Sequence, residues 1–396
     1  MQFLFNPVWE GHQHEGSWHL VLSRLTVLFF ALGIAATAVA QTGMAWPEAD
    51  ELFHSDPRWL GADAAFSIDL GHGRVLWMFN DTFVARKPGD DRSHSAFVRN
   101  TVAIQSGYDP SHATIKFYWR TRRGSPSEIF PSEGPVWMWP GSGIRIGNRL
   151  LLFCPRVASD SAKDSLGFKS VGWSAYWVTN PDDEPNVWKL KIATEVSDTT
   201  MIMASEALRE DGFVYLFGQS EPEHHLYMAR LSIENFAKGK LSPLRWWSDT
   251  GWQADSSKRS PVLRNVGTES SLQRDPGGMG FIEVNSEGFG ASTIVMRRAR
   301  NLQGPWSPPK VIYRPPESDA PDAFVYAGKS HPELKGADLI LTYVANGPDE
   351  KVAKDTSLYF PRFVKVDLHS WEPAQQLPKA SGQIVAQPEV ILKVTN

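Results

Sequence analysis

The 396-residue chain contains a single cysteine, Cys154. One thiol cannot form an internal disulfide or a zinc cluster of several cysteines. The chain also lacks a large excess of either charge, because 40 basic and 44 acidic residues give a formal net charge of −4. A chain without a basic excess offers no electrostatic footprint for nucleic acid, so no nucleic-acid partner is expected.

Several catalytic motifs are missing as well. The sequence has no G-x-S-x-G nucleophile elbow, no phosphate-binding loop and no H-E-x-x-H zinc motif. Helical periodicity is confined to residues 233–237. The chain is instead rich in aromatic residues, at 12%, and contains 16 Trp, 31 Gly and 28 Pro. This composition is typical of an all-β protein with many turns.

The N-terminal 40 residues predict an export signal. Arg24 precedes an apolar run over residues 25–40, which ends in the small residues of the sequence Ala38-Val39-Ala40. A membrane anchor is the alternative, but the run is short for a span of about 20 residues. We expect cleavage after Ala40, a secreted or periplasmic protein, and no stable membrane span after cleavage. The predicted domains are a signal peptide (1–40), a lead-in (41–58) and a repeat domain (59–396).

Five hairpin-like units follow one another in the rest of the chain. Each unit closes on a glycine turn, and the five turn glycines are spaced 74, 65, 66 and 58 residues apart; they are Gly73, Gly147, Gly212, Gly278 and Gly336. Residues 116–119 and 304–308 carry outer-strand signals between hairpins. Radial four-stranded units of this size predict a five-bladed β-propeller. A pair of β-sandwiches is the alternative, but it does not account for a fivefold period.

The first hairpin carries a pair of carboxylates. Asp63 and Asp81 are placed symmetrically about His72, the centre of the hairpin turn. Residues that face each other across an antiparallel ladder have Cβ atoms about 5 Å apart. Repulsion between two carboxylates that close raises the pKa of one of them. Glycoside hydrolysis needs such a separation, because one carboxyl acts as the acid and the other as the base or nucleophile. Alternatively, Asp63 caps a turn and Asp81 bonds backbone amides.

Other candidate site residues lie at the openings of the predicted blades. Each has an alternative structural role: channel lining for the acids, inter-blade core for the tryptophans, packing for the histidine and a surface salt bridge for the arginine. The candidates are Glu206, Glu269 and Glu333 as a third carboxylate, Trp137 and Trp139 as a sugar platform, and His331 and Arg362 as ligand contacts. No metal ligands and no cofactor are predicted, although the sequence leaves a central structural cation as an open alternative.

The opening segment also resembles a known family. The run GADAAFSIDLGHGRVLWMFNDTF at 61–83, the following Arg99 and Asn100, GPWS at 304–307 and HPEL at 331–334 are similar to secreted bacterial five-bladed propellers. That group, long classed as a domain of unknown function, is similar to glycoside hydrolases that include endo-D-arabinanases. The resemblance covers about residues 59–368. One departure is Asn80, which stands where the family usually has glycine.

The resemblance implies that Asp63 and Asp81 are the catalytic carboxylates, and it adds Asn100 to the substrate-binding candidates. The expected function is a secreted glycoside hydrolase acting on a furanoside polymer or oligosaccharide, with a carbohydrate partner. Which aspartate is the acid stays open, as does the stereochemical outcome, which depends on the carboxylate separation. The alternatives are a non-catalytic carbohydrate-binding propeller and a protein-interaction scaffold.

Overall fold

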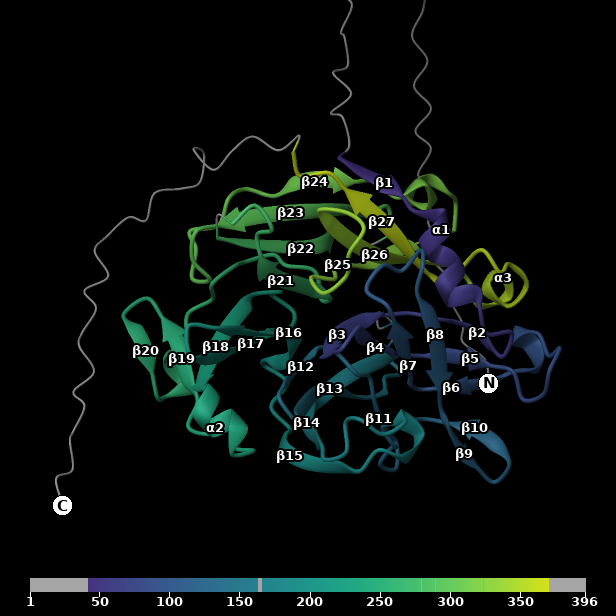
Figure 1. The fold of residues 1–396 in the computed structure, drawn as a ribbon, viewed down its shortest axis with the longest axis horizontal. Helices are drawn as coiled ribbons and strands as arrows, with labels where there is room; N and C mark the ends of the chain where they lie inside the picture. Colours follow the sequence, from purple (N-terminus) through teal and green to yellow (C-terminus); the bar gives the residue numbers. More distant parts are fainter. Residues whose placement is uncertain (1–41, 163–165, 279, 289, 323, 370–396) are drawn as a thin grey trace, which may run out of the picture.

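The computed structural model describes residues 42–162, 166–278, 280–288, 290–322 and 324–369. The predicted signal peptide, residues 1–40, lies outside the described residues. Strands dominate, and the sheets are arranged around a common centre (Figure 1). Among the described residues no helix is long and apolar enough to cross a membrane.

Most strands belong to five antiparallel sheets of four or five strands. The first sheet contains β3 (Phe66–Gly71), β4 (Arg74–Phe79), β7 (Thr101–Ser106) and β8 (Thr114–Tyr118). The second contains β11 (Val136–Met138), β12 (Gly143–Ile146), β13 (Arg149–Ser159), β14 (Phe168–Val178) and β15 (Leu190–Val196). The third contains β16 (Ile202–Glu210), β17 (Phe213–Gln219), β18 (Leu226–Ser232), β19 (Arg245–Ser248) and β20 (Gly251–Gln253).

The last two sheets complete the circle. The fourth contains β21 (Ser270–Arg274), β22 (Phe281–Glu287), β23 (Thr293–Ala299) and β24 (Lys310–Tyr313). The fifth contains β25 (Phe324–Ser330), β26 (Leu339–Asn346), β27 (Pro361–Val366) and β1 (Gly43–Ala45). Because β1 pairs with β27, part of the predicted lead-in is a strand of the fifth sheet.

Small elements decorate the sheets. A three-stranded sheet contains β2 (Trp59–Ala62), β5 (Thr82–Val84) and β6 (Ala96–Val98), and β9 (Arg120–Arg122) pairs with β10 (Ser125–Ser127). The α-helices are α1 (Pro47–Asp50), α2 (Ile233–Ala237) and α3 (Asp349–Lys354). Short 3-10 helices cover Glu51–His54, Arg92–His94, Pro185–Val187, Ser256–Lys258 and Pro316–Asp319. The predicted helix at 233–237 is thus confirmed.

The inner strands of the five sheets follow one another around the centre. β3 contacts β12, β12 contacts β16, β16 contacts β21, and β21 contacts β25. The circle closes where Ser67 of β3 meets His331, which directly follows β25, with 2.5 Å between Oγ and Nδ1. The fold is therefore all-β and propeller-like, as the repeats predict.

Apolar side chains fill the spaces between neighbouring sheets. One cluster joins the fifth and first sheets and contains the fully buried rings of Phe53, Trp77 and Phe363. The Phe53 ring lies 5.1 Å from the rings of both Trp77 and Phe363. Burial of such large rings contributes about 1.5–3 kcal/mol each. The lead-in therefore belongs to the core of the fold.

One outer-strand prediction is wrong. The signal at 116–119 falls largely within β8, as expected, but residues 304–308 precede the outer strand of the fourth sheet, which is β24. Pro305, Pro308 and Pro309 surround this segment. Proline lacks the N–H that a ladder requires, so the segment cannot pair continuously.

Replacing Phe53 tests whether the lead-in is structural. We expect Phe53→Ala to lower the free energy of unfolding by about 3–5 kcal/mol, because a buried ring is lost from a packed cluster. Chemical denaturation measures this change. Phe97→Ala is the control, since Phe97 is exposed. An equal, small effect of both substitutions would show that residues 51–54 are not part of the core.

Candidate active site

The hairpin symmetry predicted for Asp63 and Asp81 is present on both sides of the pair. Phe66 pairs with Met78 in the first sheet, and Ala62 pairs with Thr82 in the small sheet. Each of these pairs is centred on position 72, as Asp63 and Asp81 are. Between them the chain leaves the ladder, because Ala64 and Ala65 adopt left-handed φ angles of 70° and 57°. The two aspartates therefore flank the same break between two sheets.

Asn80 helps to hold this break together. Its backbone N–H donates a hydrogen bond of 3.3 Å to the carbonyl of Asp63. The side chain of Asn80 is buried, and its backbone is not among the left-handed residues. An asparagine therefore fits at this position without the conformational freedom of the glycine that the resemblance implies.

Asp63 is held by side chains of the fifth sheet. The Tyr326 hydroxyl donates to Oδ2 at 2.7 Å, and the Asn346 amide donates to the same hydroxyl at 3.2 Å. Oδ1 is buried and accepts no hydrogen bond from the described residues. Burial raises the pKa of Asp63 well above its usual range, and the charges of Asp81 and Glu269 add to the effect. Both effects favour the neutral carboxyl over the carboxylate.

Asp81 has a different environment. Arg99 donates to Oδ2 at 3.0 Å, and the Trp139 indole N–H donates to Oδ1 at 3.1 Å. Burial raises the pKa of Asp81 to about 6, while Arg99 and the Trp139 hydrogen bond oppose the shift. The side chain keeps 13% of its surface exposed. Asp81 is therefore ionised above about pH 6, whereas burial and the neighbouring charges favour the protonated form of Asp63.

The two tryptophans support Asp81 instead of forming an open platform. Trp137 is buried, and the Arg99 guanidinium lies over its ring at 4.1 Å. Trp139 is half-buried and uses its N–H on Asp81. The expectation of two stacking surfaces is thus corrected, because Trp137 faces the arginine that pairs with Asp81. Of the two tryptophans, Trp139 is the one that is partly exposed.

Glu269 forms a buried ion pair beside Asp63. Its Oε2 lies 2.7 Å from Nζ of Lys329, which is 2% exposed. Lys329 also donates to the carbonyls of Ala64 and Ala327. Burial lowers the pKa of Lys329, and Glu269 and Asp63 oppose this shift. Of the third-carboxylate candidates, Glu269 lies near the aspartate pair, and its charge is balanced by a lysine.

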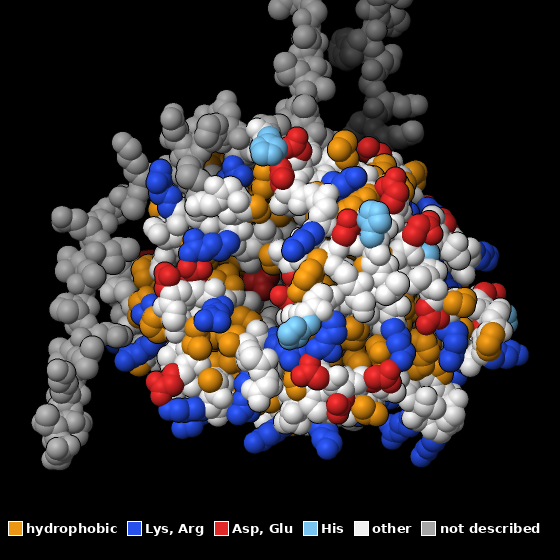
Figure 2. Space-filling view, viewed as in Figure 1, with side chains coloured by type: hydrophobic (Ala, Val, Ile, Leu, Met, Phe, Trp, Pro, Cys, Tyr) orange, Lys and Arg blue, Asp and Glu red, His pale blue; other side chains and the backbone are white. Residues whose placement is uncertain are grey.

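Glu206 and Glu333 occupy the central channel. They line a cavity of about 320 Å³ between the inner strands, together with Ser142, Ser270 and Lys329. Figure 2 shows this hollow near the centre of the molecule, with acidic side chains inside it. Burial raises the pKa of Glu206 to about 8 and that of Glu333 to about 7. The charge of Glu333 adds to the rise in the pKa of Glu206, and Lys329, the partner of Glu269, lines the same cavity.

Comparisons with known proteins agree with this fold. A family model described as a domain of unknown function, DUF5005, matches residues 48–371. The chain belongs to the DUF5005 family. No curated protein matches it. A candidate hydrolase from Bacteroides ovatus ATCC 8483 superposes with a TM-score of 0.67 at 16% identity, covering 84% of this chain and 93% of the other.

Two further structures superpose more loosely. An endo-arabinase from Bacteroides thetaiotaomicron VPI-5482 has a TM-score of 0.44 at 13% identity, covering 77% of this chain and 94% of its own. A GH43 enzyme from Xanthomonas citri, complexed with xylose, has a TM-score of 0.42 at 13% identity, covering 80% and 91%. At such identities the likeness concerns the fold alone, and among these three structures the Bacteroides ovatus protein has the highest TM-score.

Three predicted contact residues have structural roles in this DUF5005 protein. Asn100 is fully buried and exchanges hydrogen bonds with the backbone of Phe130 and Met138. Both ring nitrogens of His331 are engaged, by Ser67 at 2.5 Å and Thr342 at 2.8 Å.

Arg362 bonds Glu317 at 2.7 Å and the Ser357 carbonyl at 2.5 Å. These contacts correspond to the surface salt bridge considered for this arginine. In the described structure the polar atoms of Asn100 and His331, and two of the Arg362 guanidinium nitrogens, bind protein groups.

Four residues complete the site of this DUF5005 protein but were not singled out from the sequence; they are Arg99, Tyr326, Lys329 and Tyr359. Tyr359 has a left-handed φ of 61° and lies beside Asp63, whose charge adds to burial in raising the pKa of the phenol. The sequence contains a local signal for one of these residues, the lysine in the strand sequence FVYAGKS of β25. A lysine in a buried strand is rare unless an acidic residue pairs with it, so its presence indicates a buried anionic partner.

The channel acids predict an unusual dependence of stability on pH. The pKa of Glu206 is higher in the folded chain than in the unfolded one, so its protonation stabilises the fold at low pH, and this contribution is lost as pH rises through about 8. We expect Glu206→Gln to raise the free energy of unfolding at pH 9 by about 1–3 kcal/mol, and the two proteins to converge near pH 4.

Urea titrations at several pH values measure this difference. Glu350→Gln is the matched control, because Glu350 is exposed on α3. A Glu206→Gln protein that is less stable than the parent at pH 9 would contradict the burial of an uncompensated carboxyl.

Proposed function

We propose that this chain is a glycoside hydrolase on a five-bladed β-propeller, in which each of the five sheets is one blade. The five glycine turns and the sequential contacts of the inner strands support this description. The catalytic groups we infer are Asp63 and Asp81, which flank the break in the first hairpin. Their opposite environments carry the proposal, since neighbouring carboxyls with separated pKa values suit acid and base roles.

In this mechanism Asp63 is the general acid. It holds a proton at neutral pH and donates it to the glycosidic oxygen as the bond to the anomeric carbon breaks. Asp81, which stays ionised beside Arg99, either removes a proton from the attacking water or attacks the anomeric carbon itself. In the second case, water then hydrolyses the glycosyl–enzyme ester while Asp63 acts as the base. Hydrolysis of this kind requires no cofactor.

The substrate we infer is a furanoside polymer or oligosaccharide, cleaved in the manner of an endo-D-arabinanase. The similarity of residues 61–83 to propellers of that type supports this class. The predicted signal peptide, cleaved after Ala40, would deliver the protein to the periplasm or the medium, where such polymers occur. A non-catalytic carbohydrate-binding propeller is the competing function, and it predicts binding without bond cleavage.

Substitution of either aspartate should abolish hydrolysis. We expect the protein to release reducing sugar from one of five polymers (D-arabinan, L-arabinan, xylan, fructan or galactan). Asp63→Asn and Asp81→Asn should each lower the rate by about 10²–10⁴-fold, as loss of an acid or base does. Asp69→Asn is the control, because Asp69 is exposed at the far end of the same hairpin. Rates that survive both substitutions would exclude this pair, and retained binding without release would favour the competing function.

The pH profile tests the roles of the two groups. The ascending limb of kcat/KM should lie near pH 6, where Asp81 ionises. Arg99→Met removes the positive charge that favours the ionised form, so the limb should move to higher pH. Arg99→Lys keeps the charge and should move the limb less. An ascending limb that stays in place in Arg99→Met would show that another group controls it.

A further inference from the structure

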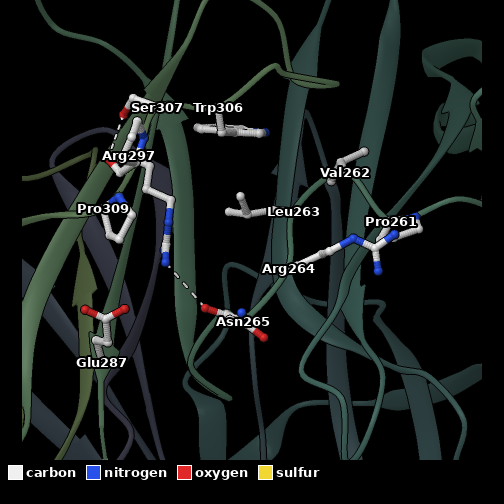
Figure 3. A pocket seen from close by; sticks show the side chains of 11 residues that line it. Pro261, Val262, Leu263, Arg264, Asn265, Glu287, Arg297, Trp306, Ser307 and Pro309 are labelled. Carbon is white, nitrogen blue, oxygen red and sulfur yellow. Dashed lines mark hydrogen bonds between the residues drawn. The ribbon is translucent and has the colours of Figure 1, made fainter.

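A second cavity lies between the third and fourth sheets, away from the channel (Figure 3). Its volume is about 550 Å³. One wall is the segment 261–265, which leads from β20 toward β21, and the other includes Arg297 of β23 and the segment 306–309 before β24. The cavity therefore sits where two neighbouring sheets meet, and it is larger than the channel cavity.

The cavity combines an aromatic ring with polar groups. Trp306 lies at one end and Glu287 and Asn265 lie at the other, with Arg297 between them (Figure 3). The indole N–H of Trp306 is buried and has no acceptor among the described residues. A buried donor without a partner carries a desolvation cost. An acceptor supplied by a ligand would remove this cost.

The walls of the cavity are fixed before any ligand arrives. Arg297 is 4% exposed, pairs with Glu283 at 2.8 Å and donates to the Asn265 carbonyl at 3.4 Å. Asn265 holds a left-handed φ of 54° and is exposed. Pro261, Pro308 and Pro309 also line the cavity, and each restricts its own backbone. Pre-formed walls reduce the entropy that binding would cost.

The charges around the cavity favour an uncharged ligand. Glu283 neutralises Arg297, and the other two charged lining residues, Glu287 and Arg264, have opposite charges. Arg264 also bonds His225 at 2.8 Å. The groups available to a ligand are one ring, one free indole donor, an exposed amide, and the exposed carboxylate of Glu287 and guanidinium of Arg264. An aromatic face beside planar hydrogen-bonding side chains suits a sugar, which has apolar C–H faces and hydroxyl groups.

We propose that this cavity is a second carbohydrate-binding site, for uncharged sugar residues of the polymer that the aspartate site cleaves. This inference rests on the proposed function. The two sites are connected along the chain, because Asn265 lies four residues before Glu269, at most about 14 Å of extended backbone. Glu269 in turn acts on Asp63. Both sites therefore border the same short segment of the chain, residues 265–269.

Binding to the uncleaved polymer tests the proposal. Affinity electrophoresis of the Asp63→Asn protein through gels containing each of the five polysaccharides measures the dissociation constant without turnover. We expect Trp306→Ala in this background to weaken binding to one polymer about tenfold, through loss of a ring contact and a hydrogen bond. Trp306→Phe should weaken it less, because the ring remains. Trp119→Ala is the control, since Trp119 is a half-buried tryptophan of the first sheet region beside Arg58.

A second variant guards against misfolding. Arg264→Ala alters an exposed side chain at the cavity and should also weaken binding, with an unchanged thermal unfolding midpoint. Unchanged affinity in both Trp306→Ala and Arg264→Ala, or no binding to any polymer, would overturn the second site. Binding that depends on Trp306 without sugar release by the unsubstituted protein would reject the hydrolase and keep the site. Sugar release by the unsubstituted protein, together with binding that does not depend on Trp306, would reject the second site and keep the hydrolase.

Discussion

A buried lysine joins three sheets at the point where the aspartate site is built. Lys329 reaches from β25 to Glu269 at the start of the fourth sheet and to the carbonyl of Ala64 beside β3. An ammonium group that is 2% exposed would be strongly destabilising without an anionic partner, so the lysine and glutamate require each other. Because Ala64 directly follows Asp63, the same contact fixes the left-handed turn that aims the catalytic candidate. The geometry of the site thus depends on one side chain, which also adds a contact between the fifth and first sheets.

The interior around this lysine contains several carboxyls, and their partners differ. Asp81 has an arginine and an indole N–H, whereas Asp63 has a tyrosine hydroxyl and a neighbouring negative charge. Burial therefore raises the pKa of Asp81 to about 6 and that of Asp63 well above its usual range. Glu206 and Glu333 extend the acidic interior into the channel, where no described cation pairs with either of them. Such an interior favours the folded state when it binds protons, which is the opposite of a surface stabilised by salt bridges.

Local sequence signals were sufficient for the repeat pattern, the helix at 233–237 and the symmetry of Asp63 and Asp81. Each depends on residues close in the chain, namely a turn glycine, an apolar alternation or a hairpin centre. The partners of the aspartates could not be found in this way, since Tyr326 and Lys329 are more than 260 residues from Asp63 and Ala64. Trp137 and Asn100 were misread because sequence alone does not distinguish an aromatic or amide that supports a site from one that touches ligand. The fifth sheet likewise needs β1, whose pairing with β27 no local pattern indicates.

Infrared difference spectroscopy of the carboxyl groups tests the central claim, the separation of the two protonation states, most directly. At pH 7 the spectrum of the unsubstituted protein minus that of Asp63→Asn should contain a protonated carboxylic C=O band. The corresponding difference for Asp81→Asn should contain carboxylate bands that convert to the protonated form as the pH falls through about 6. A pair of difference spectra showing carboxylate bands for Asp63 at pH 7 would contradict the account, because both aspartates would then be ionised and no proton donor would remain in the pair.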